Sequence, residues 1–149
     1  MKIKRSTLRA VRNIGWASLL ALTMLVGIGQ ASNSADLGKY LDAARDNMLK
    51  MLDAKDASSR DAAYAEVKRA TESLDSALTG MLTAAPEAEK SKLNEFKSIW
   101  EAFKNTRETE LVSAALSGDP EKVKVAKEKA GSVQKERFGK MKQLVEELK

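Results

Sequence analysis

The chain has 149 residues, of which 32% are charged and 43% hydrophobic, and its formal net charge is +5. This length suits a single domain with one modest core. The chain contains neither cysteine nor histidine, which excludes disulfides, thiolate metal sites, and the histidines that serve as general bases and haem ligands in many other proteins.

The excess positive charge lies at the N-terminus. Five basic residues precede the first acidic residue, Asp36: Lys2, Lys4, Arg5, Arg9 and Arg12. The remaining basic residues equal the 21 acidic residues in number. A neutral body with interspersed charges of both signs is typical of a solvated helical surface. We therefore expect no nucleic-acid partner.

An uncharged apolar run over residues 14–29 follows these basic residues. This order is that of a secretory signal, and the small residues Gly29 and Ala31 predict cleavage after Ala31. The run is also shorter than the roughly 20 residues of a spanning helix. The alternative is a retained anchor in the inner membrane, with Arg12 on the cytoplasmic side. Both alternatives make residues 1–31 a signal peptide or anchor and place residues 32–149 in the periplasm.

Two helices are predicted over residues 36–56 and 60–84. In the first, apolar or small residues recur at alternating spacings of four and three, which is the pattern of a helix packed in a bundle: Leu37, Leu41, Ala44, Met48 and Met51. Ser58 or Ser59 is the expected N-cap of the second helix. Its stripe is Tyr64, Val67, Ala70 (or Thr71), Leu74, Ala77 (with Leu78) and Met81. Pro86 ends this helix, because a residue before proline disfavours helical geometry.

Two further helices are predicted over residues 87–117 and 120–148. Gly118 suits the left-handed position after the third helix, and Asp119 with Pro120 is a typical start for the fourth. The third stripe is Leu93, Phe96, Trp100, Phe103, Arg107, Leu111 and Ala114. The fourth is Val123, Ala126, Ala130, Val133, Arg137, Met141, Leu144 and Leu148. The fold class is therefore all-α: an up-down-up-down antiparallel four-helix bundle preceded by an N-terminal signal or anchor helix.

Five residues on the last two stripes are candidates for more than packing. We expect Phe96, Trp100 and Phe103 to be structural core, with a pocket for an aromatic or aliphatic ligand as the alternative. Arg107 and Arg137 are expected to snorkel or to pair with a nearby acid, such as Glu110 beside Arg107 or Glu136 beside Arg137. The alternative is a carboxylate-binding role, which the guanidinium geometry suits. No catalytic constellation, metal site or phosphate-binding loop is present in the sequence, so we expect neither an enzyme nor a cofactor.

The run from Ser98 to Arg107, continuing through Glu110 and Leu111 to the corner at Gly118, resembles part of a known sensor module. That module is the periplasmic four-helix-bundle ligand-binding domain of bacterial methyl-accepting chemotaxis receptors. Residues 127–148 and the N-terminal basic and apolar segments resemble it as well. The resemblance implies a homodimer that binds a small molecule near the membrane-distal end and takes part in signal transduction.

Two departures from that family bear on the function. The chain ends at Lys149 without a second span or a signalling region, so we expect a stand-alone or truncated module that lacks its own signalling region. Aspartate-type receptors carry clustered arginines on the distal part of their first helix. This sequence has only Arg45 and Lys50 there, and these two are the candidate ligand-binding residues. The stripes of the first and fourth helices are the expected dimer surfaces.

The expected function is thus a non-enzymatic periplasmic sensor-like module. The alternative is an envelope accessory or chaperone-like helical protein, which would hold partners on an exposed apolar face. Phe138, beside the stripe of the fourth helix, is the feature of the sequence that favours this alternative.

Overall fold

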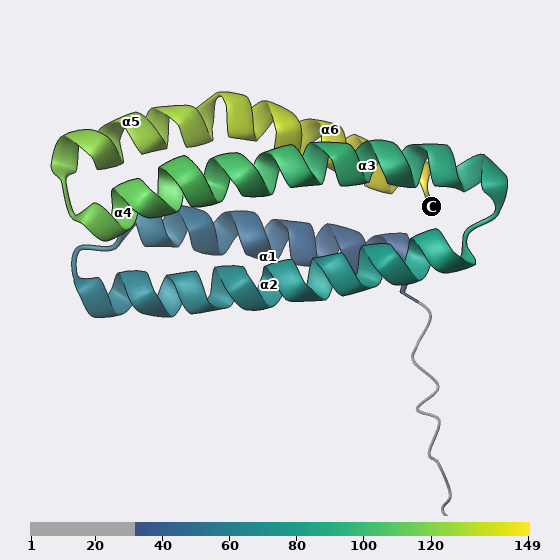
Figure 1. The fold of residues 1–149 in the computed structure, drawn as a ribbon, viewed down its shortest axis with the longest axis horizontal. Coiled ribbons are helices and arrows are strands. Elements are labelled where there is room, and N and C mark those ends of the chain that lie inside the picture. Colours follow the sequence, from purple (N-terminus) through teal and green to yellow (C-terminus); the bar gives the residue numbers. More distant parts are fainter. Residues whose placement is uncertain (1–31) are drawn as a thin grey trace, which may run out of the picture.

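The computed structural model describes residues 32–149, which form four long helical segments lying side by side (Figure 1). Successive segments alternate in direction, so the fold of this part is an antiparallel helical bundle. The predicted signal peptide or anchor, with the predicted cleavage after Ala31, lies outside the described residues. Within residues 32–149, no helix combines the length and apolar character needed to cross a membrane.

The first two segments are α1 (Ser34–Asp53) and α2 (Ala57–Ala84). Asn33 caps α1 by accepting the Asp36 N–H at 3.0 Å, and the Asp36 carboxylate accepts the Asn33 N–H in return. Asp56 caps α2 by accepting the Ser59 N–H at 2.8 Å. The prediction of Ser58 or Ser59 as this cap is therefore wrong. Because an aspartate earlier in the chain caps α2, that helix begins three residues before the predicted position.

The third segment contains a π-helical turn, whereas the sequence predicts one regular helix over residues 87–117. It consists of α3 (Glu87–Thr106), the π-helix η1 (Arg107–Val112) and α4 (Ser113–Ser117). A π turn accommodates one residue more than an α turn. Gly118 then adopts the left-handed conformation, with φ of 68°, as predicted.

The fourth segment is broken near its middle into α5 (Pro120–Gly131) and α6 (Val133–Glu147). Asp119 caps α5 as predicted, accepting the N–H groups of Glu121 and Lys122. The break falls at Ser132, whose φ and ψ are −115° and −95°. Val133, predicted to be buried, is 43% exposed, and Gln134 takes the inward position at 1% exposure. The change of inward-facing residue from Val133 to Gln134 thus coincides with the irregular backbone at Ser132.

The segments pack as two layers, α1 with α2 and the third segment with α5 and α6 (Figure 1). α1 also lies against α6, where Gly38 permits a close approach: a Cβ atom there would lie 3.3 Å from Cγ1 of Val145. The beginning of α1 and Lys149 therefore lie at the same end of the bundle. We call the half of the bundle nearest to them the chain-end half and the other the distal half.

The core is divided between these two halves. In the chain-end half it is built around Phe96, Trp100 and Phe103, which pack with leucines of α1 and α2 and with Met141 of α6. In the distal half it is built largely from small and flexible residues: Met48, Met51, Leu52, Val67, Leu111, Val112, Ala114, Ala115, Ala126 and Ala130. Polar side chains occupy the boundary between the two clusters, at the start of η1.

Candidate functional site

Arg107 lies at this boundary and is 2% exposed. Its Nε atom donates to Oε1 of Glu108 at 2.8 Å, and its Nη2 atom forms an ion pair with the same oxygen at 2.8 Å. Its guanidinium also lies 5.6 Å from the centre of the Trp100 ring, where cation–π attraction adds to the packing. Nη1 has no hydrogen-bond partner within residues 32–149. The predicted pairing with Glu110 is wrong, because Glu110 pairs with Lys129 of α5.

Tyr64 connects this arginine pair to α2. Its hydroxyl donates to Oε2 of Glu108 at 2.8 Å, so that Glu108 is held from two helices. The hydrogen bond to Glu108 raises the pKa of the Tyr64 hydroxyl above its ordinary value, and burial and the negative charge of Glu108 act in the same direction. The three side chains therefore form a polar link from α2 to η1.

Gln134 and Arg137 tie α6 to the end of α3. Nε2 of Gln134 donates to the Phe103 carbonyl at 2.9 Å. Nη1 of Arg137 donates to the Ala102 carbonyl, to Oγ1 of Thr106 and to Oε1 of Gln134, at 3.1, 2.7 and 3.1 Å. The predicted pairing of Arg137 with Glu136 is wrong, because Glu136 pairs with Lys140 one turn away on the solvent side.

The three aromatic residues of the third stripe are all fully buried. The rings of Trp100 and Phe103 stack with their centres 5.6 Å apart. The indole N–H of Trp100 donates to Oδ1 of Asp75 at 2.6 Å. These residues lie in the core, as expected from the sequence, and they line none of the surface hollows described below.

Arg45 and Lys50, the candidate ligand-binding residues, are not brought together. Arg45 lies over the ring of Phe138 on α6, 4.7 Å from its centre. Lys50 borders a shallow hollow between α1 and α2 and contacts Oδ1 of Asn47 at 3.4 Å. Phe138 is itself only partly accessible, because it packs against the chain-end core beneath Arg45. We therefore place the candidate site elsewhere.

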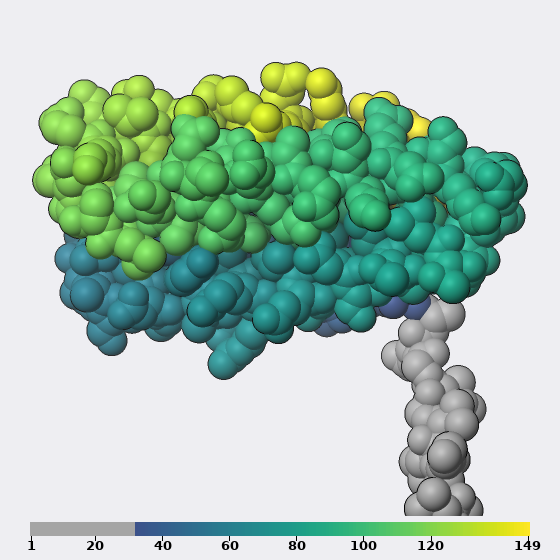
Figure 2. All heavy atoms as spheres, viewed as in Figure 1, coloured from purple at the N-terminus to yellow at the C-terminus, as the bar shows by residue number. Residues whose placement is uncertain are grey.

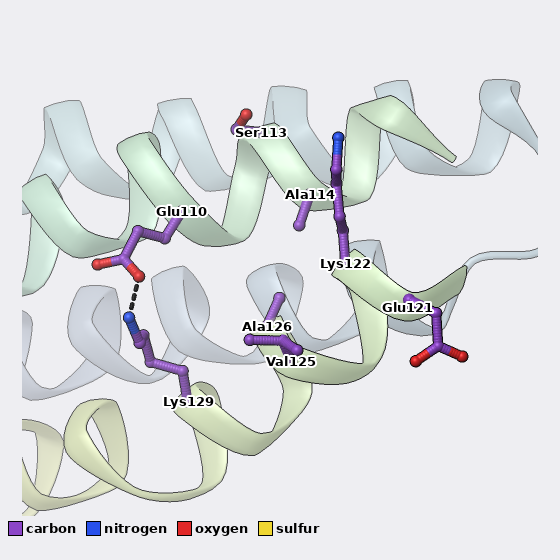
Figure 3. Close-up of a pocket in the computed structure, with 8 residues that line it drawn as sticks. All are labelled: Glu110, Ser113, Ala114, Glu121, Lys122, Val125, Ala126 and Lys129. Carbon is purple, nitrogen blue, oxygen red and sulfur yellow. Dashed lines mark hydrogen bonds and ion pairs between the residues drawn. The ribbon is translucent and has the colours of Figure 1, made fainter. Parts of the chain in front are cut away.

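The candidate site is a groove of about 450 Å³ in the distal half, between η1–α4 and α5 (Figure 3). The buried residues Ala114 and Ala126 form its floor, and the side chain of Val125 lies beside them. Its lining residues come from both walls: Glu110, Ser113, Ala114, Glu121, Lys122, Val125, Ala126 and Lys129. In the space-filling view, α4 and α5 form the end of the bundle opposite the α2–α3 connection (Figure 2).

The two ends of the groove differ in charge. At one end the ion pair between Glu110 and Lys129 joins the two walls. At the other end the side chain of Lys122 extends past Ala114, whereas the carboxylate of Glu121 points away from the groove (Figure 3). Lys122 forms no ion pair within residues 32–149. The groove thus presents an apolar floor with one uncompensated ammonium group at its edge.

Three large apolar side chains remain exposed on the third and fourth segments, and one of them, Val125, lines the groove. The large hydrophobic residues that remain exposed in the described part of the chain are Leu116 on α4, Val125 on α5 and Val133 at the start of α6, with 47%, 58% and 43% of their surface accessible. None lies on α1 or α2. The exposed large hydrophobic side chains of the described residues therefore all lie on the two segments that form the groove.

Sequence reasoning missed the groove for a physical reason. Its floor is made of alanines, which also serve as ordinary bundle filler, and its rim is made of lysines and glutamates that are typical of any solvated helix. Within residues 32–149, no cluster of three or more acidic side chains is arranged to hold a metal ion. Comparison of the chain with protein-family models, with curated proteins and with solved structures gives no match.

Proposed function

We propose that this protein is a non-enzymatic, exported binding module of the chemoreceptor sensor type, and that a small molecule binds in the groove between η1–α4 and α5. The groove is the observation that supports this proposal. Its volume of about 450 Å³ lies in the range of small-molecule sites, which combine mostly apolar walls with a few polar groups.

The position of the groove supports the same function. α1 begins at the end of the bundle opposite the groove. If residues 1–31 hold the protein at the inner membrane, the groove lies on the membrane-distal side, where the resembling sensor modules bind their ligands. The periplasmic location comes from the N-terminal segment, either after cleavage near Ala31 or by anchoring through residues 14–29.

The proposed module acts as a homodimer and passes its signal to a separate protein, as in chemotaxis. The dimer cannot use the predicted stripes of the first and fourth helices, because Leu37, Leu41 and Met141 on those stripes are buried within one chain. The exposed apolar side chains of Leu116 and Val133 offer an alternative contact surface.

The first test asks whether ligands stabilise the protein. The full-length gene is expressed, and the exported protein is purified. Intact mass distinguishes cleavage after Ala31 from a retained segment, and scattering gives the oligomeric state. The melting temperature is then measured in the presence of amino acids, organic acids, amines and neutral amides. A ligand that binds only the folded state stabilises it by RT ln(1 + [L]/Kd) and therefore raises the melting temperature increasingly as its concentration exceeds Kd. Failure of every compound class to move the transition would overturn the binding function.

Exposed Leu116, Val125 and Val133 favour a second candidate, an envelope accessory protein that holds unfolded partners. This function predicts that the protein suppresses aggregation of a reduced, unfolding client, as followed by light scattering. It also predicts that Val125→Lys abolishes suppression, whereas Lys124→Gln on the neighbouring exposed position does not. A client that aggregates equally with and without the protein would exclude this candidate.

A further inference from the structure

We infer that the ligand of the groove is an organic anion with a compact apolar body, and that its carboxylate binds the ammonium group of Lys122. This inference rests on the proposed function, since it names the chemical class of ligand for the same groove. It follows from the distribution of charge around the groove and from the length of its floor.

The charges around the groove leave one positive group unopposed. Glu110 and Lys129 neutralise each other across the two walls. Glu121 points away from the groove (Figure 3). A cation is therefore disfavoured at the edge marked by Lys122, and a carboxylate there would form a charge-assisted hydrogen bond.

Asp119 does not cancel this positive charge. Its Oδ1 atom accepts the backbone N–H groups of Glu121 and Lys122 at 3.0 and 3.4 Å. The carboxylate is thereby held against the positive end of the α5 dipole, whose partial charge it offsets. The ammonium group of Lys122, at the end of a long side chain, remains available to a ligand within the described part of the chain.

The floor limits the size of the ligand. Lys122 and Lys129 lie seven residues apart on one side of α5, which corresponds to about 10 Å along a helix. Ala114, Ala126 and the exposed Val125 occupy the interval. A single ring or a short acyl chain fits between the Lys122 edge and the Glu110–Lys129 pair. Such a body would cover Val125, which is otherwise 58% exposed.

The test uses two matched sets of probes on the full exported protein. One set is hexanoate, hexanamide and hexylamine, and the other is phenylacetate, phenylacetamide and phenethylamine. Each set keeps the apolar body and changes only the charge of the head group. Calorimetry or chemical-shift titration is expected to show binding of the two anions, with the amides weaker by about tenfold because a charge-assisted contact is lost.

Two variants locate the contact. Lys122→Gln is expected to lower the affinity for the anions by about tenfold and to leave the affinity for the amides unchanged, because only the charge is removed. Lys124→Gln, which removes a charge that does not line the groove, serves as the matched control and should leave every affinity unchanged. Circular dichroism melting of both variants checks that the bundle is intact, since both positions are exposed.

The outcomes separate the ligand class from the function. If the amines or amides bind as tightly as the anions, or if Lys122→Gln retains full affinity for the anions, the assignment of an anionic ligand is overturned and the binding function stands. If no member of either set binds and the wider compound panel is also silent, the binding function itself falls. Selective anion binding that is lost only in Lys122→Gln establishes the inference.

Discussion

Arg107 is buried at the boundary between the two core clusters, yet one of its three nitrogens has no partner within residues 32–149. A buried donor without a hydrogen bond costs about 1–3 kcal/mol. Glu108, which accepts from Nε and forms an ion pair with Nη2, has a side chain that is 39% exposed. The favourable part of the arginine's environment is therefore its packing against Trp100 more than its ion pair.

Arg107→Met is expected to raise the free energy of unfolding by about 1 kcal/mol, because the unpaired donor is removed while most of the packing volume is kept. Arg107→Ala is expected to lower it by about 2–4 kcal/mol, because it leaves a cavity next to Trp100. Urea denaturation of the two variants measures both changes. A large loss of stability in Arg107→Met would show instead that the ion pair with Glu108 dominates.

Tyr64→Phe is expected to lower the free energy of unfolding by about 1 kcal/mol at neutral pH, because the hydrogen bond to Glu108 is lost. The raised pKa of Tyr64 means that the folded state holds the phenolic proton more tightly than the unfolded state. This stabilisation is complete below the ordinary pKa of 10.0 and disappears as the pH rises through the raised pKa. The difference between the two proteins should therefore shrink at high pH.

Tyr40→Phe is the matched control for this experiment, because the Tyr40 hydroxyl forms no hydrogen bond within residues 32–149. Its effect on stability should be small at neutral pH. Equal effects of the two substitutions at every pH would contradict the role assigned to the Tyr64–Glu108 contact.

For single residues, the sequence predicts which side chains are unusual but not which groups they contact. Arg107 and Arg137 stand out because they interrupt apolar stripes. Their partners depend on backbone geometry: Glu108 accepts from Arg107 where the chain enters the π turn, and the carbonyl of Ala102 lies within reach of Arg137 across the helix interface. Spacing along one helix cannot reveal either contact.

The spacing of apolar residues in the third segment explains why the π-helix η1 forms. The stripe of the third segment alternates between three and four up to Phe103, and then two steps of four lead through Arg107 to Leu111. Two successive steps of four rotate a stripe out of register on an α-helix. The π turn absorbs the extra residue, so that Leu111 and Ala115 still point into the core.

Deletion of Thr109 is therefore expected to be tolerated. Without this exposed residue, Leu111 follows Arg107 by three positions, and a continuous α-helix keeps the stripe in the core. Circular dichroism should show a cooperative transition within about 5 °C of the parent, which for a chain of this size corresponds to a change of about 1–2 kcal/mol. The groove should change shape, because Glu110 of η1 lines it, and anion binding should fall.

Deletion of Lys97 provides the contrast. It also removes one exposed residue, but from the regular part of α3. The deletion rotates Leu93 and Phe96 by about 100° relative to Trp100, because each residue of an α-helix turns the chain by that angle. This variant is expected to lose its cooperative transition. Comparable loss in both deletions would contradict the view that the π turn stores a single extra residue.

Across the whole molecule, the two core clusters differ in the size of their side chains. Both clusters contain alanines and methionines, but the chain-end cluster also contains Trp100, Phe96 and Phe103, whereas the buried residues of the distal cluster include no aromatic side chain. Aromatic side chains bury far more apolar surface than alanines do. The distal half, which carries the groove, should therefore open at a lower free energy than the chain-end half.

Native-state hydrogen exchange measures this difference directly. Amides around Trp100 in α3 are expected to exchange at or near the free energy of global unfolding. Amides around Ala126 in α5 should exchange through a local opening that requires less free energy. A bound ligand in the groove should slow exchange at Ala126 more than at Trp100. A single exchange free energy across both clusters would show that the polar boundary does not divide the bundle.

The helical bundle itself could be predicted from sequence because its determinants are local. Apolar spacing, the Gly118 turn and the Asp119 cap each act within a few residues. The groove could not be predicted in this way. It arises where the Ala114 and Ala126 surfaces face each other across two segments, and the sequence contains no local sign of which small residues will face solvent.

Because the number of antiparallel helical segments is even, the last segment ends near the place where α1 begins. Gly38 of α1 packs against Val145 of α6, so a short flexible linker can join Lys149 to Ser34. The loop at Lys55, an exposed position between α1 and α2, is then a suitable place to open new termini. Such a circular permutant of residues 34–149 keeps every helix intact and changes only the order in which they are synthesised. Native-like melting and anion binding in this permutant would mean that the bundle is specified by its contacts, independently of where synthesis begins.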